Sequence, residues 1–136
     1  MRKIVCVIAT IIILLVVIIV IYSPNDNYAT IDLGFTEQIT LIGRHSDAKV
    51  TVTSQNDIQN IILTIQNGTT TWPRDLDTMV GCPFDVTLVF EGNVRKVYVS
   101  PATDGCAPIA IDGRLFSIDG ISKTTLFELI KKYIDF

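Results

Sequence analysis

Side chains that could bind a metal ion or act as an acid or base are few in this sequence. Asp75 and Asp77 form the one close acidic pair, and Asp85 follows them along the chain. Carboxylate oxygens at such spacing could bind calcium, but the alternating ligand series of an EF-hand, which ends in glutamate, is absent. We therefore interpret the pair as part of an acidic surface loop, and we predict no metal site and no cofactor.

His45 is the only histidine, and it lies in a polar, turn-like segment. A single histidine cannot make a histidine-based zinc site without help from cysteine. A Ser-His-Asp arrangement would need His45, yet the sequence has no Gly-x-Ser-x-Gly motif to carry the serine. We predict a solvent-exposed turn histidine and a protein that is not an enzyme. The alternative is a small cell-envelope enzyme that uses carboxylates or a loop-bound metal.

Two of the three cysteines, Cys82 and Cys106, lie outside the apolar N-terminal run that contains Cys6. In an oxidising compartment such a pair is expected to form a disulfide. Closing a loop of about 25 residues would stabilise the fold by roughly 3 kcal/mol. Free thiols and a redox-active pair remain the alternatives, although the wide spacing is unlike Cys-x-x-Cys.

The longest stretch without a clear period runs from Gln66 to Pro83 and contains Trp72, the only tryptophan. Long loops in compact domains are often functional, and tryptophan is favoured where proteins bind one another. We interpret Trp72 first as folding back over the core beside Cys82. The alternative is an interaction loop at 66–81, which is the best functional candidate in the sequence, with Trp72, Arg74, Asp75 and Asp77 as its candidate contact residues.

An uninterrupted apolar run, Ile4–Tyr22, follows the basic tip of Arg2 and Lys3. About 20 apolar residues are enough for a helix to cross a bilayer, and the preceding positive charges place the N-terminus in the cytoplasm. We predict a cytoplasmic tip at 1–3, a single-pass transmembrane anchor at 4–22, a tether at 23–35 and an extracytoplasmic domain at 36–136. The alternative is secretion after cleavage of a signal peptide, although this run is longer than is typical.

The part after the anchor is large enough for one domain and is acidic. Without Arg2 and Lys3, the 11 lysines and arginines of the chain become 9, against 14 aspartates and glutamates. This negative balance argues against binding of nucleic acid and against attraction to anionic lipid. We expect no nucleic-acid partner, contact with the membrane through the N-terminal helix, and a protein partner in the cell envelope.

The first half of the domain reads as a hairpin followed by a helix. Residues 37–42 and 49–53 alternate between apolar and polar side chains, as paired strands do. Ser54 and Asp57 then have the spacing of a capping box. Four isoleucines follow at i, i+3, i+4 and i+7, which predicts a helix that ends at Asn67-Gly68; they are Ile58, Ile61, Ile62 and Ile65.

The second half reads as a four-strand meander and a last helix. Residues 84–91 and 94–100 alternate around Gly92-Asn93, which predicts a two-residue turn with Leu88 opposite Val97. A second hairpin joins 109–111 to 114–118 through Asp112-Gly113, and Ser122 is expected to cap the final helix. The predicted fold class is α+β, with two helices packed on one face of an antiparallel sheet in the order hairpin, helix, four-strand meander, helix.

The anchor, the isoleucine-rich helix, Cys82-Pro83-Phe84, Asp104-Gly105-Cys106 and the late Lys131-Lys132-Tyr133 together form a recognisable pattern. This pattern resembles small membrane-anchored or secreted extracytoplasmic domains of Gram-positive bacteria, and it extends over most of the chain. Those domains have no assigned function. The resemblance therefore implies a compartment and a fold, and it carries no catalytic residue to this sequence.

Taken together, these patterns predict a non-catalytic, membrane-tethered extracytoplasmic domain that binds another molecule. The alternative is an accessory subunit or an inhibitor of a cell-envelope complex.

Overall fold

The computed structural model describes residues 30–45, 48–71 and 81–136, and the predicted anchor at 4–22 lies outside these ranges. Within them, the helices are too short or too polar to span a membrane. The described chain forms one antiparallel sheet and two helices, which confirms the predicted α+β class. The elements are β1 Gln38–Gly43, β2 Lys49–Val52, α2 Gln55–Gly68, β3 Thr69–Thr71, β4 Val86–Glu91, β5 Lys96–Pro101, β6 Pro108–Ile111, β7 Arg114–Ile118 and α3 Gly120–Ile130.

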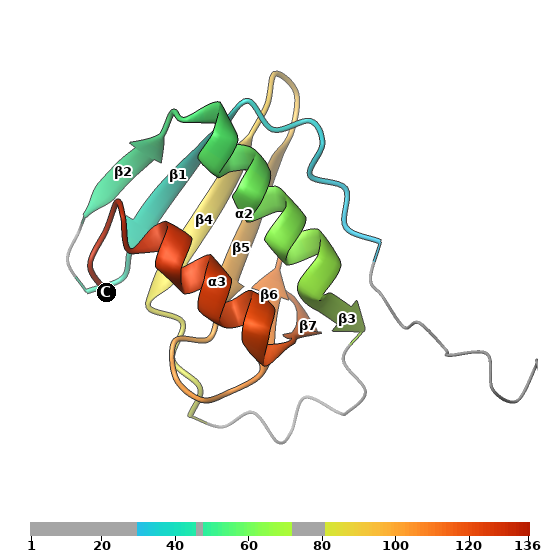
Figure 1. Cartoon of the computed structure of the whole chain (residues 1–136), viewed down its shortest axis with the longest axis vertical. Helices are drawn as coiled ribbons and strands as arrows, with labels where there is room; N and C mark the ends of the chain where they lie inside the picture. Colours follow the sequence, from blue (N-terminus) through green and yellow to red (C-terminus); the bar gives the residue numbers. More distant parts are fainter. Residues whose placement is uncertain (1–29, 46–47, 72–80) are drawn as a thin grey trace, which may run out of the picture.

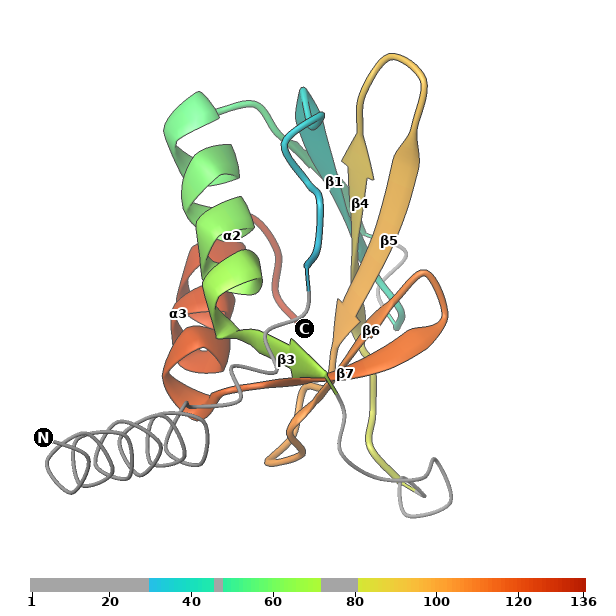
Figure 2. The same cartoon turned by 90° about the vertical axis from the view of Figure 1, so that its right-hand side faces the viewer.

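The seven strands lie in the order β2-β1-β4-β5-β6-β7-β3. The predicted meander is the run from β4 to β7, and the predicted hairpin joins it because β1 pairs with β4. Both helices cover the same face of this sheet, side by side, as the two perpendicular views show (Figures 1 and 2). The other face has no helix over it in the described chain.

The core lies between the helices and the sheet. Apolar side chains from alternate positions of β1, β4 and β5 meet the isoleucine stripe of α2 and the apolar side of α3. The predicted helical stripe is confirmed, since all four isoleucines are buried. Side chains with no exposed surface include Ile61, Ile65, Leu41, Leu88 and Phe90.

The segment before β1 also belongs to this packed layer. Leu33 is completely buried, and Ile31 and Phe35 pack against the core cluster. The side-chain amide of Gln66, on α2, donates a hydrogen bond to the backbone oxygen of Ile31 at 2.8 Å. Residues that the sequence pattern placed at the end of a tether therefore help to close the core.

The strand β3 is the element that the sequence analysis missed. Thr69–Thr71 was expected to lie within an irregular loop, but it pairs with β7 and forms one edge of the sheet. The helix α2 ends at Gly68 and β3 begins at the next residue. An added Cβ at Gly68 would lie 2.2 Å from the Cβ of Ser122, so glycine at this position lets the start of α3 pack closely against the end of α2.

The predicted turn between β4 and β5 was wrong by two residues. Glu91 pairs with Lys96 and Leu88 with Val99, so the connection is a four-residue loop. A Cβ on Gly92 would lie 2.4 Å from the backbone oxygen of Phe35, so glycine serves close packing here rather than a positive φ. A shift of two residues keeps each side chain on its face of the sheet, which is why the predicted burial still holds.

Capping was predicted correctly for one helix and wrongly for the other. The Ser54 hydroxyl accepts a hydrogen bond from the Asp57 amide at 3.3 Å and caps α2. For α3 the cap is Asp119 rather than Ser122, because the Asp119 carboxylate accepts from the amides of Ile121 and Ser122. Aspartate and serine are comparably good N-cap residues, and the helix begins at the earlier position because the Asp119 carboxylate accepts from two free amides of the first turn.

Acid sensitivity should arise where the end of the chain meets the start of α2. The Tyr133 hydroxyl donates to Asp57 at 2.5 Å and Lys132 pairs with the same carboxylate at 3.2 Å. The Tyr133 hydrogen bond, followed by Lys132, holds the pKa of Asp57 below its ordinary value of 3.8. Stability from this contact is present above that ordinary value and is lost as the pH falls through the lowered pKa.

We expect the Tyr133→Phe variant to lose stability at pH 7 and to show a smaller further loss on acidification than the parent. Urea unfolding at several pH values between 7 and 2 measures the free energy of unfolding of both proteins. Because Asp85 and Glu91 also have lowered pKa values, both proteins should still weaken in acid. An identical pH dependence in the two proteins would contradict the assignment to Asp57.

Candidate functional site

A groove with a volume of about 360 Å³ runs between the two helices on their solvent side. From α2 it is lined by Asn60, Leu63, Thr64 and Asn67, and from α3 by Ile121, Ser122, Thr125 and Leu129. None of these eight residues is charged. Its walls therefore offer aliphatic contact and neutral hydrogen-bonding groups, and they share with the centres of protein interfaces the scarcity of charged residues.

Two aliphatic side chains stand out along this groove. Leu63 is 51% exposed and Ile121 is 82% exposed, although both belong to well-formed helices. Leu63 lies off the buried stripe of α2, so an aliphatic residue occupies the side of the helix that is otherwise polar. The groove was not predicted from the sequence. The signal for its α2 wall was Leu63, an apolar residue outside the predicted stripe.

A second cluster lies just before the start of β4 and is centred on Asp85. One oxygen of Asp85 accepts from Nε2 of His45 at 3.0 Å, and the other accepts from the Thr103 hydroxyl at 2.5 Å. The Thr103 hydrogen bond, and then His45, hold the pKa of Asp85 below its ordinary value. An ionised carboxylate can only accept, so Nε2 of His45 carries a proton.

This arrangement is unsuited to nucleophilic catalysis. The Thr103 hydroxyl donates to the carboxylate, and the histidine contacts the same carboxylate rather than the hydroxyl, so the imidazole is not placed to take the proton of Thr103. The His45 side chain is 77% exposed, in agreement with the predicted turn histidine. The cluster ties the β1–β2 turn to the loop after β5.

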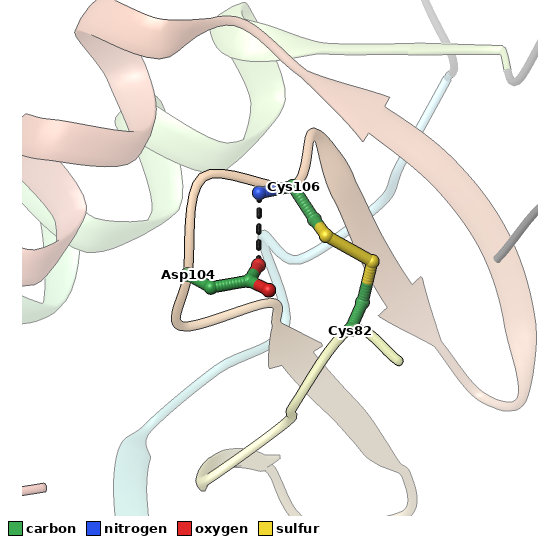
Figure 3. A group of neighbouring side chains, drawn as sticks. All are labelled: Cys82, Asp104 and Cys106. Carbon is green, nitrogen blue, oxygen red and sulfur yellow. Dashed lines mark hydrogen bonds between the residues drawn. A yellow bond between two sulfur atoms is a disulfide. The ribbon is translucent and has the colours of Figure 1, made fainter. Parts of the chain in front are cut away.

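The predicted disulfide between Cys82 and Cys106 is present in the structure, with the two Cα atoms 6.1 Å apart. Asp104 lies in the same turn, and its carboxylate accepts a hydrogen bond from the Cys106 amide at 2.8 Å (Figure 3). Lys123, on α3, donates from Nζ to the backbone oxygens of Asp104 and Cys106. Burial lowers the pKa of Lys123 from its ordinary value.

The candidate interaction residues of the predicted loop, Trp72, Arg74, Asp75 and Asp77, lie outside the described residues. Their role stays a prediction. Asp104 and Lys123, which complete the surroundings of the disulfide, were not predicted as a group. The Asp104-Gly105-Cys106 sequence contained the signal, because aspartate two residues before an amide often forms such a turn.

The chain was compared with known protein families, characterised proteins and solved structures. No family model, characterised protein or solved structure matches this chain. The helix groove is an uncharged hollow between α2 and α3, the Asp85 cluster joins two loops, and the disulfide turn holds the remaining group of potential ligands in the described ranges.

Proposed function

We propose that this protein is a membrane-tethered extracytoplasmic domain that binds another protein without catalysis, and that the helix groove is its contact surface. The partner surface would present aliphatic side chains surrounded by neutral hydrogen-bonding groups. The cell envelope of a Gram-positive bacterium is the proposed setting.

The uncharged lining of the groove is the observation that supports this function best. The chain carries 25 charged residues among 136, yet none of those in the described ranges lines the groove. Exposed aliphatic groups such as Ile121 are poorly solvated, and burying one under a partner gains roughly 1.5–3 kcal/mol. Charged groups would have to be desolvated at the same surface, so their absence favours association with a neutral partner.

The proposed tether supports the same function. Ile4–Tyr22 would hold the domain at the outer surface of the membrane, and Arg2 and Lys3 would remain in the cytoplasm. Confinement to a membrane raises the effective concentration of a domain near partners in the same membrane. A contact surface with only modest affinity can then be sufficient for the domain to bind its partner.

Co-purification of the full-length protein from its own membranes, after chemical cross-linking, tests the proposal. The Leu63→Lys and Ile121→Lys variants should each lose a partner that the parent enriches, because both place a charge on the apolar groove. We expect enrichment to fall by about tenfold or more, since loss of a residue at the centre of an interface costs about 2 kcal/mol or more when that residue carries the binding.

The matched control is Val94→Lys, because Val94 is 98% exposed but lies on the loop between β4 and β5, away from the groove. This variant should retain the partner. A variant with 72–80 replaced by glycine and serine tests the predicted Trp72 loop in the same experiment. Loss of the partner from the loop variant but not from the two groove variants would contradict the helix groove as the contact surface.

A further inference from the structure

We propose that Cys82, Asp104 and Cys106 form a binding site for a thiophilic divalent cation such as zinc, and that the site exists only when the disulfide is reduced. Two thiolates and a carboxylate are ligands that zinc accepts in proteins, with one position left for water. The proposal is independent of the helix groove.

The three side chains converge in the oxidised protein already. The two sulfur atoms and a carboxylate oxygen of Asp104 all lie within 4.8 Å of one another. Figure 3 shows the Asp104 carboxylate within the turn that leads to Cys106, with the disulfide beside it. After reduction the sulfurs need to separate only to about 3.8 Å, the spacing that two Zn–S bonds of about 2.3 Å at a tetrahedral angle require.

Contacts other than the disulfide hold the turn together, so the ligands should stay close after reduction. The Thr103 amide donates to the backbone oxygen of Pro83 at 2.9 Å, which joins the two cysteine-bearing segments. The Asp104 carboxylate fixes the Cys106 amide, and Lys123 holds two backbone oxygens of the same turn. Both cysteines are half-buried and are thus open to a small reductant.

The chemistry needs an external dithiol or phosphine as the reductant. With a dithiol, two electrons and two protons pass to the protein: the Cys82–Cys106 bond breaks, two thiols form, and the dithiol becomes a disulfide. Binding of the cation then releases the two thiol protons, because thiolates are the ligands. A divalent ion with two thiolates and one carboxylate carries a net charge of −1, which the nearby Lys123 ammonium would offset.

Titration of cobalt(II) into the full-length protein in mild detergent tests the site, with a Cys6→Ser background to remove the third thiol. After reduction with a phosphine, we expect one cobalt per chain, with thiolate-to-metal charge-transfer absorption and the strong visible bands of tetrahedral cobalt. Zinc should displace the cobalt. The oxidised protein should show none of these bands.

The Cys82→Ser and Cys106→Ser variants should each abolish the charge-transfer bands. Asp104→Asn should weaken cobalt binding by about tenfold or more. Changing a residue that only hydrogen-bonds to a metal ligand already lowers metal affinity by that factor, and Asp104 is proposed as a ligand itself. Asp32→Asn is the matched control, because Asp32 is an exposed carboxylate in a different segment. Equal weakening by Asp32→Asn and Asp104→Asn, or unchanged binding in Asp104→Asn, would overturn the three-residue site.

Circular dichroism of the same samples separates loss of ligands from loss of fold. We expect the reduced protein to keep its secondary structure and to gain thermal stability when zinc is added. A reduced protein that unfolds and is not refolded by zinc would overturn the proposal, as would a folded reduced protein that takes up no cobalt.

Discussion

Replacing Ile61 by alanine should lower the free energy of unfolding by about 2–5 kcal/mol, the range measured for large-to-small changes in protein cores. Ile61 has no exposed surface and lies in the isoleucine stripe that joins α2 to the sheet. The change removes buried apolar surface and leaves a cavity. Because small domains are stable by only about 5–15 kcal/mol, the loss should be plain in urea unfolding followed by circular dichroism.

Leu63→Ala is the matched control for this prediction. Leu63 lies two residues further along the same helix, but it faces the helix groove and is half exposed. Its truncation should change stability by no more than about 0.5 kcal/mol, as is usual for surface positions. If both variants lost stability equally, the division of α2 into a core face and a contact face would be wrong.

Loss of the disulfide should have the second large effect. The Cys82→Ser/Cys106→Ser double variant is expected to lose about 3 kcal/mol, because the unfolded chain regains the freedom that a 24-residue separation between the bonded cysteines had restricted. Urea unfolding of the oxidised parent and of the double variant measures the difference in free energy of unfolding. We expect the double variant to remain folded at room temperature.

A reductant provides the internal check. It should bring the metal-free parent close to the stability of the double variant and should leave the double variant unchanged. If reduction did not alter the parent, the covalent link would contribute nothing to stability. If the double variant failed to fold at all, the hydrogen bonds of Thr103 and Lys123 would be too weak to hold the turn.

The elements whose side chains repeat at a regular interval could be predicted from the sequence. The stripe of α2 and the alternation of β4 and β5 follow directly from which side chains are apolar. The turn at Asp112-Gly113 could also be predicted, because both residues adopt a positive φ there and this residue pair favours such a turn.

Features that depend on contacts distant in sequence could not be predicted in this way. The three threonines of β3 carry no apolar alternation, and they form a strand because they follow α2 directly and lie beside β7, which comes more than forty residues later in the sequence. The β4–β5 loop is set in part by Phe35, more than fifty residues earlier. The helix groove likewise needs α2 and α3 side by side before Leu63 and Ile121 line one surface.

Site-specific photo-cross-linking in the native membrane tests the central claim most directly. A photo-reactive side chain would be placed at Ile121 in one full-length variant and at Val94 in another, since both positions are exposed on different parts of the domain. We predict one discrete cross-linked protein from position 121 and none from position 94. A discrete product from 94 alone, or no product from 121 in folded protein, would contradict the helix groove as the contact surface.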